Sequence, residues 1–212
     1  MTISTTTSAD AAAPKKSALP TILTIFRIVM GPAIAALILW AAGQLYSDRL
    51  LAGFIFALSV ALFILAALTD WADGWLARKL DAVTPLGAAL DHAADKVLIT
   101  CVLVALAYAA LPMQLVAASV LILGRDVAVA GLREGIAAQG KTLPVSQLGK
   151  WKAAAEMGGV GAFLAYQAAA ILLAPAELVL GLNWAAAILL WAAAALALIS
   201  GAQYVAALVR RA

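Results

Sequence analysis

Five aspartates lie close together in an otherwise apolar chain of 212 residues. They occupy positions 70, 73, 81, 91 and 95, so one short segment holds five of the 11 acidic residues. A charged side chain at the centre of a membrane helix costs roughly 2.5 to 3.5 kcal/mol, and such residues therefore mark functional sites. We expect this segment to carry the chemistry of the protein.

The spacing of four of these acids predicts a metal site. Asp70 and Asp73 share one face of a helix, and Asp91 and Asp95 share one face of the next. Like charges about 4 Å apart repel by about 4 kcal/mol at an effective dielectric of 20, so four converging carboxylates need cations. Oxygen ligands suit Mg²⁺ or Mn²⁺, whereas one histidine and one cysteine argue against zinc.

The residues beside the acids suggest phosphoryl chemistry. Gly74 and Ala77 leave one face of the helix without bulk, and Arg78 adds a fork-shaped donor suited to phosphate. Metal ions among carboxylates can stabilise both the attacking and the leaving oxygen of a phosphoryl group. Two alternative explanations are close helix packing for the small residues and a charge anchor at the membrane surface for Arg78.

Eight positions together form a motif with fixed spacing. These are Asp70, Asp73, Gly74, Ala77, Arg78, Gly87, Asp91 and Asp95, in the pattern D-x2-D-G-x2-A-R-x8-G-x3-D-x3-D. This motif resembles the signature of the CDP-alcohol phosphatidyltransferases. The resemblance implies six transmembrane helices, a site for two metal ions, and transfer of a phosphatidyl group from CDP-diacylglycerol to an alcohol with release of CMP.

The same resemblance implies a role for each motif position. Asp70, Asp73, Asp91 and Asp95 would be metal ligands, and Asp95 would also be the base that deprotonates the acceptor hydroxyl. The cytidine diphosphate part of the lipid substrate would contact Gly74, Ala77, Arg78 and Gly87. Asp81 lies outside the motif, and we assign it to a solvated turn.

Two further segments resemble the phosphatidylglycerophosphate synthases within that family. The opening "LPTILTIFRI" resembles their P-N-x-L-T-x-x-R pattern, with Thr21 in place of the Asn, and this resemblance implies that Thr24 and Arg27 bind CDP-diacylglycerol. A later segment, residues 124–157, resembles the same region of these enzymes and includes the cations Arg125, Arg133, Lys150 and Lys152. Charge-assisted donors of this kind would bind the phosphate of an anionic acceptor such as glycerol 3-phosphate.

Composition predicts an all-α integral membrane protein. The chain is 66% hydrophobic and 12% charged, where a soluble domain has about 25% charged residues, and its mean hydropathy is +1.03. We expect a tail over residues 1–18 and one transmembrane domain over residues 19–212. Candidate spans are Leu19 to Ala42, Leu50 to Thr69, Leu86 to Leu111, Leu115 to Ala138, Leu148 to Leu173 and Asn183 to Val209. The net charge of +3 gives no support for nucleic-acid binding.

Lysine and arginine counts predict the orientation. Eight of these residues fall on the side of the predicted bundle that holds both termini, and the opposite loops offer only Arg49. Because positive loops stay in the cytoplasm, we expect cytoplasmic termini and an active site that faces the cytoplasm from the bacterial inner membrane. The resemblance also implies a homodimer, for which the small residues of "GGVGAF" (158–163) and the Ala-rich helix faces offer close-packing surfaces.

Two kinds of alternative remain at this stage. Within the enzyme class, the acceptor could be serine, inositol phosphate or phosphatidylglycerol. From a different class, a transporter of divalent cations could also bury acids among helices, but it would need polar groups along a path across the bilayer. The acids here gather at one end of the predicted helices, which favours an enzyme.

Overall fold

The computed structural model describes residues 19–79, 85–138, 140 and 147–209, and within these ranges the side chains of 23–69, 90, 93–138, 140 and 147–206. The described residues form six α-helices. Their bounds are Leu19–Gln44 (α1), Arg49–Lys79 (α2), Pro85–Ala109 (α3), Met113–Ala137 (α4), Gln147–Ile171 (α5) and Ala176–Val209 (α6). The predicted all-α fold is confirmed. The predicted tail over residues 1–18 lies outside the described residues.

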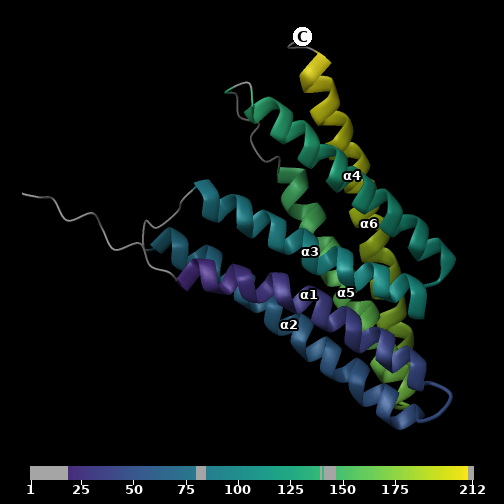
Figure 1. Ribbon diagram of the computed structural model, residues 1–212. Coiled ribbons are helices and arrows are strands. Elements are labelled where there is room, and N and C mark those ends of the chain that lie inside the picture. Colours follow the sequence, from purple (N-terminus) through teal and green to yellow (C-terminus); the bar gives the residue numbers. More distant parts are fainter. Residues whose placement is uncertain (1–18, 80–84, 139, 141–146, 210–212) are drawn as a thin grey trace, which may run out of the picture.

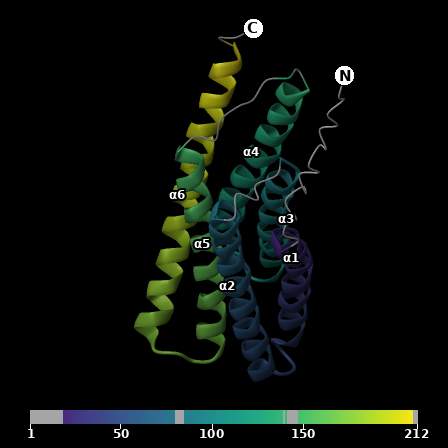
Figure 2. The same cartoon turned by 90° about the vertical axis from the view of Figure 1, so that its left-hand side faces the viewer.

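Successive helices run in alternating directions (Figures 1 and 2). The turns from α1 to α2 and from α5 to α6 therefore lie at one end of the bundle. The start of α1 and the ends of α2 and α6 lie at the other. This second end also holds the start of α3, so the acidic motif and the last turns of α6 are on the same side of the protein.

Four of the six helices are long and apolar enough to cross a membrane within the described residues. These stretches are Leu23–Gln44, Arg49–Thr69, Met113–Ala137 and Ala176–Ala206. The other two helices, α3 and α5, carry charged residues in their first halves, such as Lys96 and Lys152. The prediction of six spans is therefore supported for four helices.

One predicted boundary was wrong. The segment before Asn183 was predicted to be a loop, but α6 already begins at Ala176. Pro175 stands just before this first turn, and the backbone amide of Leu178 donates to its carbonyl oxygen at 3.0 Å. Proline is compatible with a helix start, and the alanine, glutamate and leucine residues that follow favour a helix.

The helices pack in two groups of three. In the first group α1 lies against both α2 and α3, and in the second α6 lies against both α4 and α5. Glycine permits the closest approaches: a Cβ on Gly31 of α1 would lie 2.9 Å from the Cα of Leu98 in α3. Similarly, a Cβ on Gly159 would lie 3.0 Å from the backbone nitrogen of Leu190 in α6. Small residues let helices associate closely where lipid offers no hydrophobic driving force.

This packing changes the interpretation of the "GGVGAF" segment. Gly159 is buried against α6, and Gly161 faces the ring of Phe63 in α2 at 3.4 Å from a Cβ position. The small residues offered as a dimer surface thus serve contacts within one chain. The expected homodimer stays a prediction that this segment no longer supports.

The two groups leave a space between them at the end that holds the acidic motif. The groups are joined mainly by α2 against α5, whereas α3 makes few contacts with α4 or α5. Large apolar side chains such as Trp40, Leu121 and Ile188 are exposed on the outside, as a lipid-facing surface requires. Polar residues of α3, α4 and α5 can therefore gather in the space between the groups.

Candidate active site

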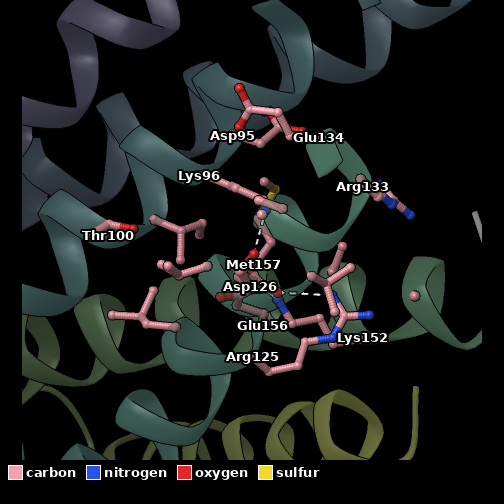
Figure 3. A pocket seen from close by; sticks show the side chains of 18 residues that line it. Asp95, Lys96, Thr100, Arg125, Asp126, Arg133, Glu134, Lys152, Glu156 and Met157 are labelled. Carbon is pink, nitrogen blue, oxygen red and sulfur yellow. Dashed lines mark hydrogen bonds and ion pairs between the residues drawn. The ribbon is translucent and has the colours of Figure 1, made fainter. Parts of the chain in front are cut away.

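A cavity of about 460 Å³ opens between α3, α4 and α5 (Figure 3). Asp95 and Lys96 line it from α3. The helix α4 contributes residues between Leu123 and Glu134, and α5 contributes residues between Gly149 and Met157. In the view of Figure 3, Asp95 lies at one side of the cavity and Arg125 and Lys152 at the other, with Lys96 between them. A small polar molecule can therefore reach the Asp95 carboxylate and the basic side chains in one space.

Arg27 of α1 pairs with the carboxylate of Asp95. The Arg27 side chain is 0% exposed and the Asp95 side chain is 34% exposed, so the pair runs from the protein interior to the edge of the cavity. Thr24 lies one turn before Arg27 on the same helix face and is also buried. A buried guanidinium needs a counter-charge, and this pair fixes where the Asp95 carboxylate points.

Lys152 of α5 lies at the centre of an ion network. Its Nζ is 2.6 Å from Oδ2 of Asp126 and 2.7 Å from Oε2 of Glu156, and the residue is 3% exposed. The second carboxylate oxygen of Asp126, Oδ1, accepts a hydrogen bond from Arg125 Nη1 at 3.1 Å. The backbone oxygen of Asp126 accepts another from Lys96 Nζ at 2.9 Å. Buried charges are stable only when paired in this way, and the network ties α3, α4 and α5 together.

The last turns of α6 hold two arginines of α4. Arg125 Nη2 donates to Ser200 Oγ at 2.9 Å, and Arg133 Nη2 donates to the Tyr204 hydroxyl at 2.7 Å. The guanidinium carbons of Arg125 and Arg133 also lie 5.7 and 5.3 Å from the centroid of the Tyr204 ring. The sequence predicts no functional residue in this helix.

Comparison with known proteins identifies the family. The profile of the CDP-alcohol phosphatidyltransferase family matches residues 17–199, which is most of the chain. This protein belongs to the CDP-alcohol phosphatidyltransferase family.

Named relatives fall into two groups. A CDP-diacylglycerol–glycerol-3-phosphate 3-phosphatidyltransferase of Rickettsia bellii is 36% identical over 186 residues, which cover 88% of this chain and 92% of the relative. An enzyme of the same name from Cereibacter sphaeroides is 41% identical over 140 residues, or 66% of this chain and 59% of the relative. A CMP-forming cardiolipin synthase of Oryza sativa subsp. japonica is 33% identical over 168 residues, or 72% of this chain and 47% of the relative. The chain therefore spans about half of the rice protein and the larger part of the two bacterial ones.

The family motif lies on two helices of the fold. Asp70, Asp73, Gly74, Ala77 and Arg78 belong to α2, and Gly87, Asp91 and Asp95 belong to α3. Asp95 is the motif residue whose side chain the structure describes, and the other motif side chains lie outside the described part. Within that part, no group of three His, Cys, Asp or Glu residues forms a metal site. The assignment of the metal ligands and of the cytidine contacts therefore stays a prediction.

The structure brings three of the four predicted acceptor-binding cations to the cavity. Arg125, Arg133 and Lys152 line it. Lys150 is exposed and is absent from the described lining, although its neighbour Gly149 belongs to it. Thr24 and Arg27 were predicted to contact CDP-diacylglycerol. Both are buried residues of α1, and Arg27 contacts Asp95.

The cavity also holds charged residues that sequence analysis did not assign. Lys96, Asp126, Glu134 and Glu156 line it together with the predicted residues. A signal for Asp126 and Lys96 existed, because each directly follows an assigned residue in an apolar helix. Glu156 lies four positions after Lys152, the spacing at which opposite charges meet on a helix. The described lining contains four basic and four acidic side chains, so the cavity is charged but balanced.

Proposed function

We propose that this protein transfers the phosphatidyl group of CDP-diacylglycerol to sn-glycerol 3-phosphate, with phosphatidylglycerophosphate and CMP as products. Its family membership and the names of its bacterial relatives support this reaction. The observation that carries the choice of acceptor is the shared cavity. A carboxylate, Asp95, and the basic side chains of Lys96, Arg125 and Arg133 line the same space.

In this proposal the Asp95 carboxylate accepts the proton of the acceptor 1-hydroxyl. The hydroxyl oxygen forms a bond to the lipid-linked phosphorus of CDP-diacylglycerol, and the bond from that phosphorus to the bridging oxygen of the diphosphate breaks. CMP leaves with the electron pair of the broken bond. Arg27 holds the Asp95 carboxylate in position, since the two side chains are paired. A base acts only within hydrogen-bond reach of the proton that it takes, so this positioning matters for the rate.

Two divalent metal ions, Mg²⁺ or Mn²⁺, form part of the same proposal. Asp70, Asp73, Asp91 and Asp95 would hold them through carboxylate oxygens, the ligands that these hard cations prefer. The described member of the set fits this role, because the Asp95 side chain is 34% exposed at the cavity edge. When bound, the ions would neutralise the negative charge of the diphosphate and of the leaving phosphate.

The basic side chains would bind the acceptor phosphate. A phosphate monoester carries up to two negative charges, and it needs donors that are not all taken by carboxylates. Asp126 and Glu156 already neutralise much of the charge of Lys152 and Arg125. Lys96 Nζ donates to a backbone oxygen, and Arg133 Nη2 donates to the neutral Tyr204 hydroxyl. We therefore assign the main phosphate contact to Lys96, with Arg125 and Arg133 beside it at the cavity.

The proposal includes a setting in the membrane. All six helices would cross the bilayer of the bacterial inner membrane, with both termini and the cavity on the cytoplasmic side, where glycerol 3-phosphate is dissolved. The proposal also includes a homodimer, because the family resemblance implies one. The "GGVGAF" segment does not support it, since Gly159 and Gly161 make contacts within the chain.

Phosphatidylglycerol is the second candidate acceptor, because one relative is named a cardiolipin synthase. An assay with purified protein, CDP-diacylglycerol and Mg²⁺ separates the candidates when glycerol 3-phosphate, phosphatidylglycerol, serine and inositol phosphate are each supplied in turn. We expect CMP release and a new lipid with glycerol 3-phosphate. Faster turnover with phosphatidylglycerol, with cardiolipin as the product, would replace the proposed acceptor and leave the family unchanged.

A further inference from the structure

We propose that Tyr204 of α6 is a positioning residue that makes the site selective for a phosphorylated acceptor by holding Arg125 and Arg133 together at the cavity. This inference rests on the proposed function. It assigns a role to a helix in which the sequence shows no catalytic motif.

The contacts of Tyr204 define this role. Its hydroxyl accepts a hydrogen bond from Arg133 Nη2 at 2.7 Å, and its ring lies 5.3 and 5.7 Å from the guanidinium carbons of Arg133 and Arg125. Tyr204 is 6% exposed, and both arginines line the cavity whereas Tyr204 lies behind them. It therefore acts on the substrate through the arginines.

One aromatic ring is well suited to hold two cations. Long arginine side chains lose rotamer freedom when they are held in place. The negative face of an aromatic ring attracts cations and offsets part of this cost. A phosphate dianion in the cavity then meets two donors that are already held in position. An uncharged acceptor such as glycerol gains nothing from this arrangement, so the pair favours phosphorylated acceptors.

The helical turn before Tyr204 also contacts Arg125. Ser200 is fully buried and its Oγ accepts from Arg125 Nη2 at 2.9 Å. At Gly201 a Cβ would lie 3.2 Å from Cγ of Arg125, so a larger residue would push against the arginine stem. Ser200, Gly201 and Tyr204 share one face of α6, and together they fix both arginines, which are two helical turns apart on α4.

The test compares Tyr204→Phe, which keeps the ring, with Tyr204→Leu, which removes it. The control is Tyr166→Leu, which makes the same change at a tyrosine outside the described cavity lining. The ring of Tyr166 packs on the ring of Phe163 in the same helix, α5, and the two ring centroids are 5.5 Å apart. Each protein is purified in detergent, and its kcat and its KM for each substrate are measured by CMP release. Inhibition by inorganic phosphate, varied against the acceptor, measures anion binding alone.

We expect Tyr204→Phe to raise the KM for glycerol 3-phosphate by about ten-fold, and Tyr204→Leu to raise it by about ten- to a hundred-fold. Phosphate should inhibit Tyr204→Leu more weakly by a similar factor. The KM for CDP-diacylglycerol should change by less than about two-fold, and Tyr166→Leu should leave the KM for both substrates unchanged. A purely structural role of Tyr204 would not raise the KM for one substrate and leave the KM for the other unchanged.

An acceptor KM for Tyr204→Leu within about two-fold of the wild type would overturn the inference, and so would equal increases for both substrates. Should Tyr204→Leu fail to fold, Tyr204→Phe decides by the same criteria. Failure of the proposed function gives a different result, because wild-type protein would then use another acceptor in place of glycerol 3-phosphate. The KM for that acceptor and the phosphate inhibition still test the role of Tyr204.

Discussion

The guanidinium of Arg27 pairs with the carboxylate of Asp95, which lies 68 positions later in the chain. The contact joins α1 to α3 at the edge of the cavity and reaches from a fully buried side chain to a partly exposed one. Asp95 is the residue that we propose as the base. Its position is thus set by a helix that contributes no acidic residue of its own.

Replacement of Arg27 by Ala should lower kcat and destabilise the protein. The change leaves the Asp95 carboxylate without this partner, and it creates a cavity where the fully buried Arg27 side chain was. Removal of one partner from a buried ion pair costs about 3 to 5 kcal/mol of stability. The partial exposure of Asp95 places the expected loss at or below the lower end of that range. We expect a lower unfolding temperature in detergent and at least about a ten-fold loss of kcat, with partial recovery in Arg27→Lys. A fully active Arg27→Ala enzyme would contradict the positioning role.

Replacement of Asp95 by Asn should stop transfer and leave binding of CDP-diacylglycerol largely intact, if the main role of Asp95 is to accept a proton. An amide has nearly the same shape as the carboxylate but cannot act as a general base at neutral pH. Binding of the nucleotide lipid can be measured by equilibrium titration. A loss of binding as large as that of Asp70→Asn would instead identify Asp95 chiefly as a metal ligand.

Removal of divalent metal should abolish CMP release. Four motif aspartates would repel one another without cations, and the diphosphate would lose the charge that neutralises it. Excess chelator should stop the reaction, and added Mg²⁺ or Mn²⁺ should restore it. Metal binding measured directly on the protein by calorimetry provides a readout besides activity. Undiminished turnover in excess chelator would refute the two-metal proposal.

Replacement of Arg133 by Ala should raise the KM for glycerol 3-phosphate by about ten- to a hundred-fold, which corresponds to the loss of a charge-assisted partner worth about 1.5 to 3 kcal/mol. Lys150→Ala is the matched control, because Lys150 is a nearby cation that is exposed and absent from the described cavity lining. We expect its effect to be much smaller. Equal effects of the two changes would indicate general attraction of the acceptor by positive charge at this end of the protein.

Replacement of Lys152 by Met should destabilise the protein more than a combined Lys152→Met, Glu156→Leu change. The single change leaves the buried carboxylates of Asp126 and Glu156 without the cation between them. The double change removes one of those charges as well, and buried ion pairs can often be replaced by apolar residues with little loss. Thermal unfolding of the purified variants measures both. A double variant less stable than the single one would show that the network depends on Glu156 for another reason.

Much of this protein is determined by local features of its sequence. Long apolar runs separated by polar breaks predict six helices because the period and length of such runs are properties of neighbouring residues. The motif is equally local: Asp70 and Asp73 lie three apart, and Asp91 and Asp95 four apart, so each pair shares one helix face whatever the remaining chain does. The resemblance to the family rests on the same short spacings, and the family profile matches residues 17–199.

The tertiary structure alone decided which helices became neighbours. Arg27 meets Asp95 because α1 packs against α3, and Arg133 meets Tyr204, 71 positions away, because α6 packs against α4. Helix periodicity says which face of a helix is polar but not which other helix covers it, and α6 is so apolar that Ser200 and Tyr204 gave no separate signal. For the same reason the sequence shows Lys152 as a free cation, whereas folding buries it between two carboxylates from separate positions of the chain.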